Sequence, residues 1–142
     1  MKFYKPTTPG QRGMSRVNYR AVLSRGRRVK SLSQGGKRAV GRNAFGRITV
    51  RHKGGGHKRV WREVDFQMNK KNVPARIATI EYDPNRSAFI GLAIYRDGER
   101  RYVVVPQKTV VGDTFVVSEE APIARGNRLP LKNIPVGTFV YN

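Results

Sequence analysis

The stretch RIATIEYDPNRSAFIGLAIYRDGERRYVVV, residues 76–105, decides the fold of this chain. It contains three short runs rich in apolar residues, at positions 76–82, 88–96 and 99–105. The DPN sequence at 83–85 marks a turn after the first run, and Asp97-Gly98 is a strong hairpin signal after the second. This pattern predicts consecutive short strands.

Two further runs flank this stretch. Residues 60–66 alternate apolar and polar side chains, and residues 114–117 follow a Gly-Asp turn signal. In the 76–82 strand, we expect Ala78, Ile80 and Tyr82 to share one face. No segment keeps a helical period. Five short strands at this spacing predict a mainly β fold, a small five-stranded barrel of the oligonucleotide-binding type. An open, sandwich-like sheet is the alternative.

Charge divides the chain into two unequal halves. Of the 29 Lys and Arg residues, 18 lie between Met1 and Arg62, where no Asp or Glu occurs. Residues 63–142 hold the other 11 together with all 9 acidic residues. A net charge of +20 destabilises a compact chain unless a polyanion neutralises it, so the partner is nucleic acid or an anionic membrane. We expect no membrane, because no apolar run approaches the ~18 residues that suggest a span.

The basic half lacks a repeating apolar pattern, and glycines interrupt it from Gly10 to Gly46. Such a segment buries too little apolar surface to offset its chain entropy. We therefore expect residues 1–59 to form a long extended arm that is disordered alone. A solubilising tail or an organelle transit peptide is the alternative. The absence of acidic residues favours a phosphate-binding arm.

The most basic segment is GRNAFGRITVRHKGGGHKRVWR, residues 41–62. Arginine suits phosphate, because its planar guanidinium can donate two parallel hydrogen bonds. Gly54-Gly55-Gly56 leaves the backbone amides unshielded, and glycines can adopt the positive φ that lets successive N–H groups converge on an anion. A flexible linker is the alternative for this triple glycine. GGGHKR matches neither of the common nucleotide-binding glycine patterns.

Other side chains in this segment give weaker signals. His52 and His57 are too few for a metal site, and the chain has no cysteine, so we expect neither a metal nor a cofactor. As RNA contacts, the histidines can stack on bases or donate to phosphate. Phe45 and Trp61 bracket the basic run and can stack likewise, although Trp61 fits a core or covering role equally well.

Two carboxylate pairs have the two-residue spacing that places them on one strand face: Glu63 with Asp65, and Glu81 with Asp83. We interpret them as salt-bridge partners of neighbouring arginines. No Ser or Lys nucleophile stands in a recognisable setting, and no histidine lies in the strand-forming half. We therefore predict no catalytic residue and no enzymatic activity.

Five runs of this sequence closely resemble one known family: KPTTPGQRG (5–13), GRITVRHKGGGHKR (46–59), ATIEYDPNRSA (78–88), DGERRY (97–102) and LPLKNIPVGTFVYN (129–142). They are similar to the second protein of the large ribosomal subunit, from about Lys5 to the last residue. Residues 17–39 resemble that family least. The first run looks like the family's mature N-terminus, which argues against a transit peptide.

The resemblance implies an arm threaded into large-subunit rRNA, an oligonucleotide-binding-type barrel and a second, SH3-like barrel. It also implies rRNA contacts at Lys70 and at Arg86. Met68 departs from the family, which commonly has a basic residue there, and Lys71 is a partial replacement. The predicted rRNA-binding residues are Arg42, Asn43, Arg47, Arg51, His52, Lys53, Gly54, Gly55, Gly56, His57, Lys58, Arg59, Arg62, Lys70 and Arg86.

We predict three regions: the arm (1–59), the barrel (60–128) and the start of a second barrel (129–142) whose remainder is absent. Residues 134–141 look like the opening strand of that barrel, with Val136 and Phe139 on an apolar face that nothing buries. We expect this chain to be half of a split ribosomal protein, with a second polypeptide supplying the other barrel. Split genes favour a mitochondrial, organelle-encoded ribosome, with bacterial and plastid ribosomes as alternatives.

The predicted function is that of a structural constituent of the large ribosomal subunit, which binds rRNA beside neighbouring ribosomal proteins. A nucleoid-type DNA-binding protein is an alternative, because it needs the same phosphate neutralisation. The barrel favours RNA, since such folds suit base stacking and irregular RNA. An enzyme that acts on RNA is the third hypothesis.

Overall fold

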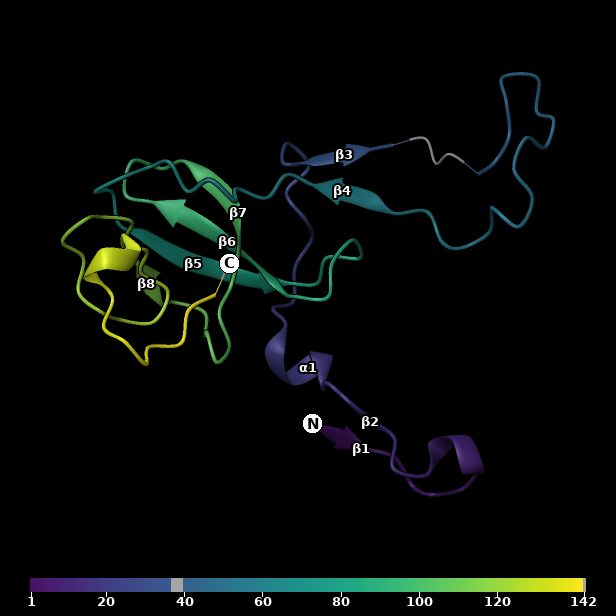
Figure 1. Cartoon of the computed structure of the whole chain (residues 1–142), viewed down its shortest axis with the longest axis horizontal. Helices are drawn as coiled ribbons and strands as arrows, with labels where there is room; N and C mark the ends of the chain where they lie inside the picture. Colours follow the sequence, from purple (N-terminus) through teal and green to yellow (C-terminus); the bar gives the residue numbers. More distant parts are fainter. Residues whose placement is uncertain (37–39, 142) are drawn as a thin grey trace.

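The computed structural model describes residues 1–36 and 40–141. A four-stranded antiparallel sheet with strand order β7-β6-β5-β8 lies at the left of the view in Figure 1. Its strands are β5 (Ala75–Glu81), β6 (Ile90–Tyr95), β7 (Arg100–Val104) and β8 (Thr114–Phe115). The sheet curls into a half-barrel, which confirms the predicted mainly β fold of the oligonucleotide-binding type.

Both predicted turns of the central stretch are present. Between β6 and β7, the Gly98 N–H donates to the Tyr95 carbonyl at 2.9 Å. Gly98 has a φ of +88°, which L side chains rarely adopt. Between β5 and β6, the Asp83 carboxylate accepts the Asn85 N–H at 2.9 Å, as Asp does in a turn of this kind. These two turns keep the three central strands adjacent.

The buried face of β5 differs from the predicted one. Ala78, Ile80 and Tyr82 were expected to share a face, but the ladder with β6 shifts register between Ile77 and Thr79. Because of this irregularity, Ile77 and Ile80 are both buried, while Tyr82 is 49% exposed. The alternation of a regular strand does not hold across such a shift. The face prediction is therefore wrong.

The buried side chains form two clusters, which lie on opposite faces of the curled sheet because neighbouring residues of β6 and of β7 divide between them. One cluster gathers around Ile77, Val103 and Phe115, and a smaller one contains Ile90, Leu92 and Tyr102. Gly91 allows the strands to approach, because a Cβ there would lie 2.6 Å from Val105 Cγ1. Any larger residue at this position would force the neighbouring side chains to move.

The first predicted strand, residues 60–66, is shorter than expected. β4 (Val60–Arg62) pairs with β3 (Ser33–Gly35), not with the four-stranded sheet. Beyond it, Val64 forms an isolated parallel bridge with Tyr102 of β7. The first predicted strand therefore does not join the ladder of the four-stranded sheet, because its partner, β3, comes from the basic arm.

The basic arm contains several short elements. β1 (Lys2–Phe3) pairs with β2 (Ser15–Arg16) around a 3-10 helix at Pro9–Gln11, and α1 spans Tyr19–Val22. After α1 the chain meets the barrel: Ser24 N–H donates to the Ile80 carbonyl at 2.9 Å. Ser24 Oγ accepts the Ile80 N–H at 3.0 Å. Disorder of the arm on its own stays a prediction.

The last residues cross back over the barrel. A 3-10 helix spans Leu131–Asn133, and residues 134–141 are irregular, so the strand predicted there is not formed. Val136 and Phe139 are fully exposed, as expected. The predicted arm includes residues 37–39 and the predicted final segment includes residue 142; these positions lie outside the described residues.

Candidate nucleic-acid interface

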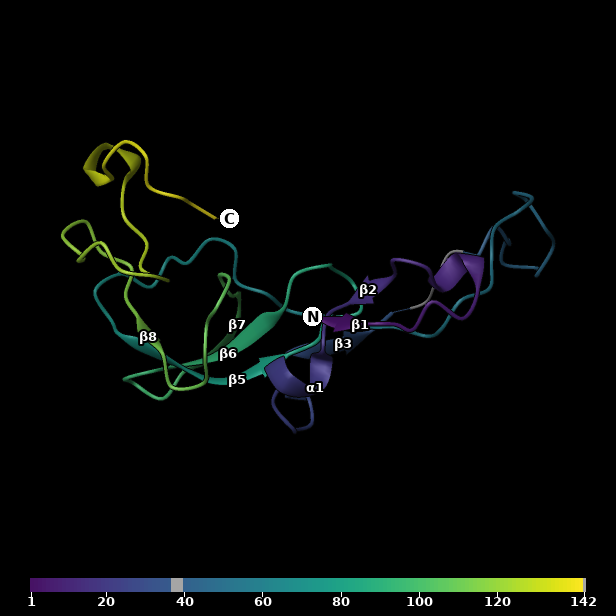
Figure 2. The same cartoon turned by 90° about the horizontal axis from the view of Figure 1, so that it is seen from below.

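The segment that connects β3 to β4 carries most of the predicted binding residues. It reaches away from the curled sheet toward the far end of the molecule in both views (Figure 1, Figure 2). Its exposed members of the predicted set are Arg42, Asn43, Arg47, Arg51, His52, Lys53, Gly54, Gly55, Gly56, His57, Lys58 and Arg59. The structure thus brings these residues together on one projecting segment, open to a large partner.

The base of this segment closes on Gly41. The Gly41 carbonyl accepts the N–H groups of Thr49 and Val50 at 2.8 and 3.2 Å. Gly41 has a φ of +68°, and a Cβ there would lie 2.4 Å from the Val50 carbonyl oxygen. Only glycine fits this close approach without moving the backbone. Residues 41–50 therefore form a closed loop that is shaped before any ligand binds.

The triple glycine adopts the conformation expected from the sequence. Gly54, Gly55 and Gly56 have φ values of +138°, +68° and +76°. A Cβ at Gly54 or Gly55 would meet nothing within 4 Å, so the backbone here is open to solvent. With His52 and Lys53, Gly54 and Gly55 line a shallow hollow. Unshielded amides beside cationic side chains suit an anion, although binding in this cradle stays a prediction.

The arm keeps its positive charge uncompensated. Within the described residues, no Lys or Arg before position 63 forms an ion pair with a carboxylate, and the ion pairs join residues between Asp65 and Arg125. Fields from clustered, unpaired cations raise the local concentration of polyanions. The electrostatic attraction for nucleic acid is therefore concentrated on the arm.

Lys70 lies away from the arm and is already paired. Its ammonium donates to the carboxylates of Asp97 and Glu99, the latter at 2.5 Å, and sits 4.7 Å from the centre of the Tyr95 ring. These hydrogen bonds, that to Asp97 first, raise the pKa of Lys70. A phosphate would have to compete with two carboxylates for this group. The rRNA contact implied by the resemblance stays a prediction.

Arg62 and Arg86 are both half-buried. Arg62 Nη1 donates to the Val60 carbonyl at 2.6 Å within β4. Arg86 Nε donates to the fully buried Asp83 carboxylate at 2.6 Å. The Arg86 guanidinium also lies 5.9 Å from the Trp61 ring and 5.2 Å from the Phe66 ring. Trp61 is 55% exposed, which makes it a covering residue and not a core residue.

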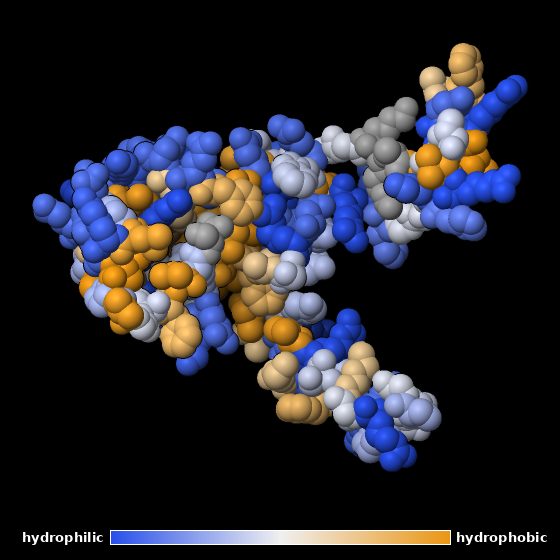
Figure 3. Space-filling view, viewed as in Figure 1, coloured by the Kyte–Doolittle hydropathy of each residue, from blue (hydrophilic) through white to orange (hydrophobic). Residues whose placement is uncertain are grey.

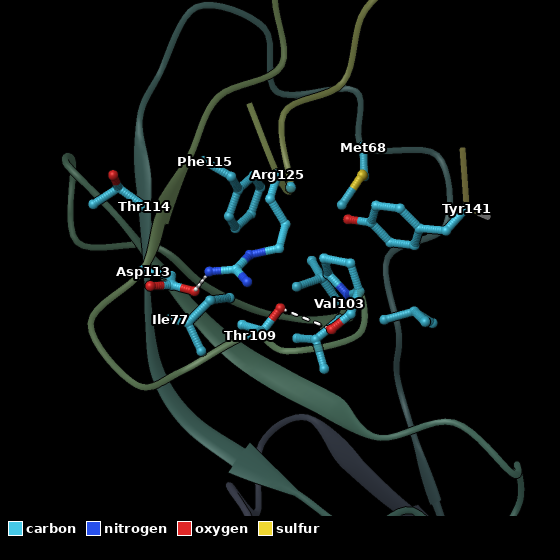
Figure 4. Close-up of a pocket in the computed structure, with 13 residues that line it drawn as sticks. Met68, Ile77, Val103, Thr109, Asp113, Thr114, Phe115, Arg125 and Tyr141 are labelled. Atoms are coloured by element: carbon cyan, nitrogen blue, oxygen red, sulfur yellow. Dashed lines mark hydrogen bonds and ion pairs between the residues drawn. The ribbon is translucent and has the colours of Figure 1, made fainter. Parts of the chain in front are cut away.

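Met68 belongs to the core. Met68 is 5% exposed, and its backbone φ is +48°. Its side chain points toward Tyr141 in a small apolar pocket (Figure 4). The pocket volume of about 20 Å³ leaves space for roughly one water molecule, too little for an organic ligand. Burial beside Met68 raises the pKa of Tyr141. Lys71, the expected replacement, is exposed and lies 3.7 Å from Glu119.

Two of the four paired carboxylates, Asp65 and Asp83, form ion pairs with arginines as expected. Asp65 accepts from Arg101 Nη1 at 2.8 Å, and Asp83 pairs with Arg86. Glu81 instead accepts a hydrogen bond from the Tyr102 hydroxyl at 2.9 Å. Arg101 bridges Asp65 and Glu99, a role that was not predicted, because Asp65 is 36 positions away along the chain and no local pattern connects the two residues.

The residues that the structure describes offer neither a metal centre nor a membrane-spanning helix. No group of three or more His, Cys, Asp or Glu side chains there could hold a metal ion. No helix in that part of the chain is long and apolar enough to cross a membrane.

Comparison with known proteins identifies a family to which the chain is similar. Residues 29–118 match the family described as Ribosomal Proteins L2, RNA binding N-terminal domain. The chain is similar to large ribosomal subunit protein uL2 of Roseobacter denitrificans, with 52% identity over all of this chain and 50% of that relative. The uL2 protein of Hyphomonas neptunium is 51% identical over all of this chain and 51% of its own length. The chain therefore spans about half the length of the curated relatives it matches.

Proposed function

Since this chain belongs to the L2 family of ribosomal proteins through its RNA-binding N-terminal domain, we propose that it is a structural constituent of the large ribosomal subunit that binds rRNA. The observation that carries this proposal is the projecting segment 40–59, whose lysines and arginines form no ion pair with a carboxylate within the described residues. A polyanion neutralises this charge when it binds.

The binding mode follows from the geometry of the arm. Arginine and lysine side chains contact phosphates, and the backbone amides of Gly54 to Gly56 receive one anion. Such contacts orient the protein on RNA and carry little base information. The base from which the segment projects is the two-stranded ladder of β3 and β4. No chemical step is required, so we propose no enzymatic activity.

The salt dependence of binding tests this mode. If about 8 phosphates are neutralised, the logarithm of the affinity falls against the logarithm of salt concentration with a slope of roughly −6 to −7. A slope shallower than about −3 contradicts a binding role of the basic arm. Affinities for a folded large-subunit rRNA fragment and for duplex DNA are compared at one salt concentration. Equal affinities favour the nucleoid-type alternative.

A matched pair of charge variants locates the binding surface. The first replaces Arg47, Arg51 and Lys58 with Gln on the projecting segment. The control replaces the exposed Arg76, Arg96 and Arg100 of the sheet with Gln, for the same change in net charge. The first variant should lose about 2 to 3 units of slope, and the control should lose less. The reverse order would place the contacts on the sheet.

The partner and compartment predictions belong to this proposal. The other half of the relatives' length comes either from a continuation of this chain or, as we propose, from a second polypeptide. Peptides of the purified ribosome that continue past residue 142 would exclude the second polypeptide. The named relatives are bacterial, which fits the bacterial alternative. The mitochondrial assignment stays a prediction that cell fractionation tests.

The division into an arm (1–59), a barrel (60–128) and a further segment (129–142) is likewise proposed. β3 lies in the proposed arm but pairs with β4 of the proposed barrel. The Val29 N–H also donates to the buried Tyr102 hydroxyl at 3.0 Å. These contacts mean that the arm is anchored to the barrel from about Leu23 to Gly35. Limited proteolysis tests whether cleavage is confined to the segments outside this anchor.

A further inference from the structure

We propose that Phe45, at the tip of the 41–50 loop, is a base-stacking residue that binds an unpaired base of RNA while neighbouring arginines hold the flanking phosphates. The proposal rests on the proposed function and adds the class of ligand that this tip recognises. Stacking by Phe45 would make this contact of the arm selective for unpaired nucleotides. The other proposed contacts of the arm are made to phosphates.

The tip is held in one shape by its own sequence. Asn43 Oδ1 accepts the N–H groups of Phe45 and Arg47 at 3.1 and 3.0 Å. The Gly46 N–H donates to the Asn43 carbonyl at 3.1 Å, and Gly46 has a φ of +77°. Asn at the first position and Gly at the fourth are the residues favoured in tight turns of this kind. Phe45 is therefore presented by a preformed turn, which lowers the entropy cost of binding.

The ring itself has no protein surface to cover. Phe45 is 89% exposed, and Ile48 and Val50 in the same loop are 62% and 49% exposed. Hydrophobic groups lie among hydrophilic ones at the far end of the segment between β3 and β4 (Figure 3). A rigid aromatic ring in water at the tip of a projecting loop gains most when a flat apolar partner covers it.

Charge selects a nucleobase as that partner. Arg42 and Arg47 flank the turn, and Arg42 Nη1 donates to the Gly46 carbonyl at 2.9 Å, which fixes its guanidinium beside the tip. No acidic residue occurs before Glu63 to attract a basic protein surface. A base offers a flat face of the right size, and its phosphates meet these arginines. Only unpaired bases expose that face, so loops, bulges and ends of RNA are the expected ligand.

The test uses the whole chain and a fluorescein-labelled oligoadenylate of about 12 nucleotides, with the same strand in an RNA duplex for comparison. Anisotropy titrations over a range of salt concentrations give affinities and salt slopes for wild type and Phe45→Ala. Phe45→Trp is the rescue variant. The matched control is Phe3→Ala, which removes another exposed ring (74%) from the same acid-free arm.

We expect Phe45→Ala to weaken binding of the single strand by about 5- to 150-fold, the range for the loss of one base–aromatic stack. The salt slope should not change, because no charge is removed, whereas Arg47→Gln should reduce its magnitude by about 0.7. Phe45→Trp should restore the affinity, and Phe3→Ala should leave it within about twofold. The loss on duplex RNA should be smaller.

Three outcomes would overturn the proposal. Wild-type binding with a steep salt slope, together with an unaffected Phe45→Ala, would leave the proposed function intact and remove the stacking tip. An equal loss on single strand and duplex would show that Phe45 acts without selecting unpaired bases. A wild type that binds none of these RNAs would remove the proposed function and the stacking tip with it.

Discussion

Arg86 donates from Nε to Oδ2 of Asp83 at 2.6 Å, and the Asp83 side chain is fully buried. Asp83 Oδ1 also accepts from the backbone and side-chain nitrogens of Asn85, whose Nδ2 donates to the Val60 carbonyl at 2.9 Å. The turn between β5 and β6 is thereby connected to β4, the strand at which the projecting segment ends. This ion pair therefore contributes to placing the projecting segment.

Arg86→Ala should destabilise the fold. The substitution leaves a buried carboxylate without its cation, which costs about 3 kcal/mol of unfolding free energy or more. Urea denaturation followed by circular dichroism measures the change. Arg100→Ala, which removes an exposed arginine from β7, is the control and should stay within about 0.5 kcal/mol of wild type. Equal stability of the two variants would mean that Asp83 is satisfied without Arg86.

The unfolding free energy of the chain should decrease at acidic pH. Hydrogen bonds from Lys70 lower the pKa of Asp97, and hydrogen bonds from Arg101 and Lys70 lower the pKa of Glu99. As the pH falls, the unfolded chain protonates these groups first. The stabilisation is therefore present above about pH 4 and is lost as the pH falls through the lower folded values.

Lys70→Met should reduce this acid-side loss, because it removes the cation that lowers both carboxyl pKa values. Urea titrations at about pH 7, 4 and 3 compare its unfolding free energy with that of wild type. Lys132→Met replaces an exposed lysine that is not part of these ion pairs, and its unfolding free energy should change with pH as that of wild type does. Parallel curves for all three proteins would show that these pairs do not contribute to the pH dependence.

Tyr102→Phe should loosen the arm. The Tyr102 hydroxyl accepts the Val29 N–H at 3.0 Å and donates to Glu81 at 2.9 Å, and burial raises its pKa to about 12. Loss of the hydroxyl leaves the Val29 N–H and the Glu81 carboxylate without this partner, which should lower the unfolding free energy by roughly 1–3 kcal/mol. Trypsin should cleave after Arg27 and Arg28 sooner than in wild type or in the exposed Tyr82→Phe control. Unchanged cleavage would show that the anchor does not need the hydroxyl.

The same tyrosine gives an alkaline prediction. Because its folded pKa is raised, the stabilisation is complete below the ordinary tyrosine pKa of about 10 and is lost as the pH rises toward about 12. Absorbance titration of wild type should show a tyrosine that ionises near pH 12. The Tyr102→Phe variant should lack this component, and its persistence would assign it to another residue.

Gly55→Val should weaken rRNA binding more than the loss of one lysine. At a φ of +68° a β-branched residue is strained by about 1–2 kcal/mol, although its Cβ would meet nothing within 4 Å. We expect up to about a tenfold loss of affinity, larger than for Lys58→Ala. Gly10→Val, at an open glycine without positive φ, is the control. Wild-type affinity for Gly55→Val would refute the glycine cradle.

The amino-acid sequence predicted the central turns and the runs that form β5, β6, β7 and β8, and its charge pattern leads us to expect that the first half binds a polyanion. Alternation over 60–66, the DPN and Asp-Gly turns, and the absence of acids before Glu63 are local properties that need no knowledge of distant neighbours. The positive φ of Gly54 to Gly56 was likewise predictable, because glycine alone adopts it freely.

Only the tertiary structure decided which predicted residues stay available to RNA and which face of β5 is buried. Lys70 is paired with Asp97 and Glu99, 27 and 29 positions away, and Met68 is buried beside Tyr141. The register shift between Ile77 and Thr79 depends on the pairing with β6. Such contacts arise between segments distant in sequence, so residue pattern and propensity do not specify them.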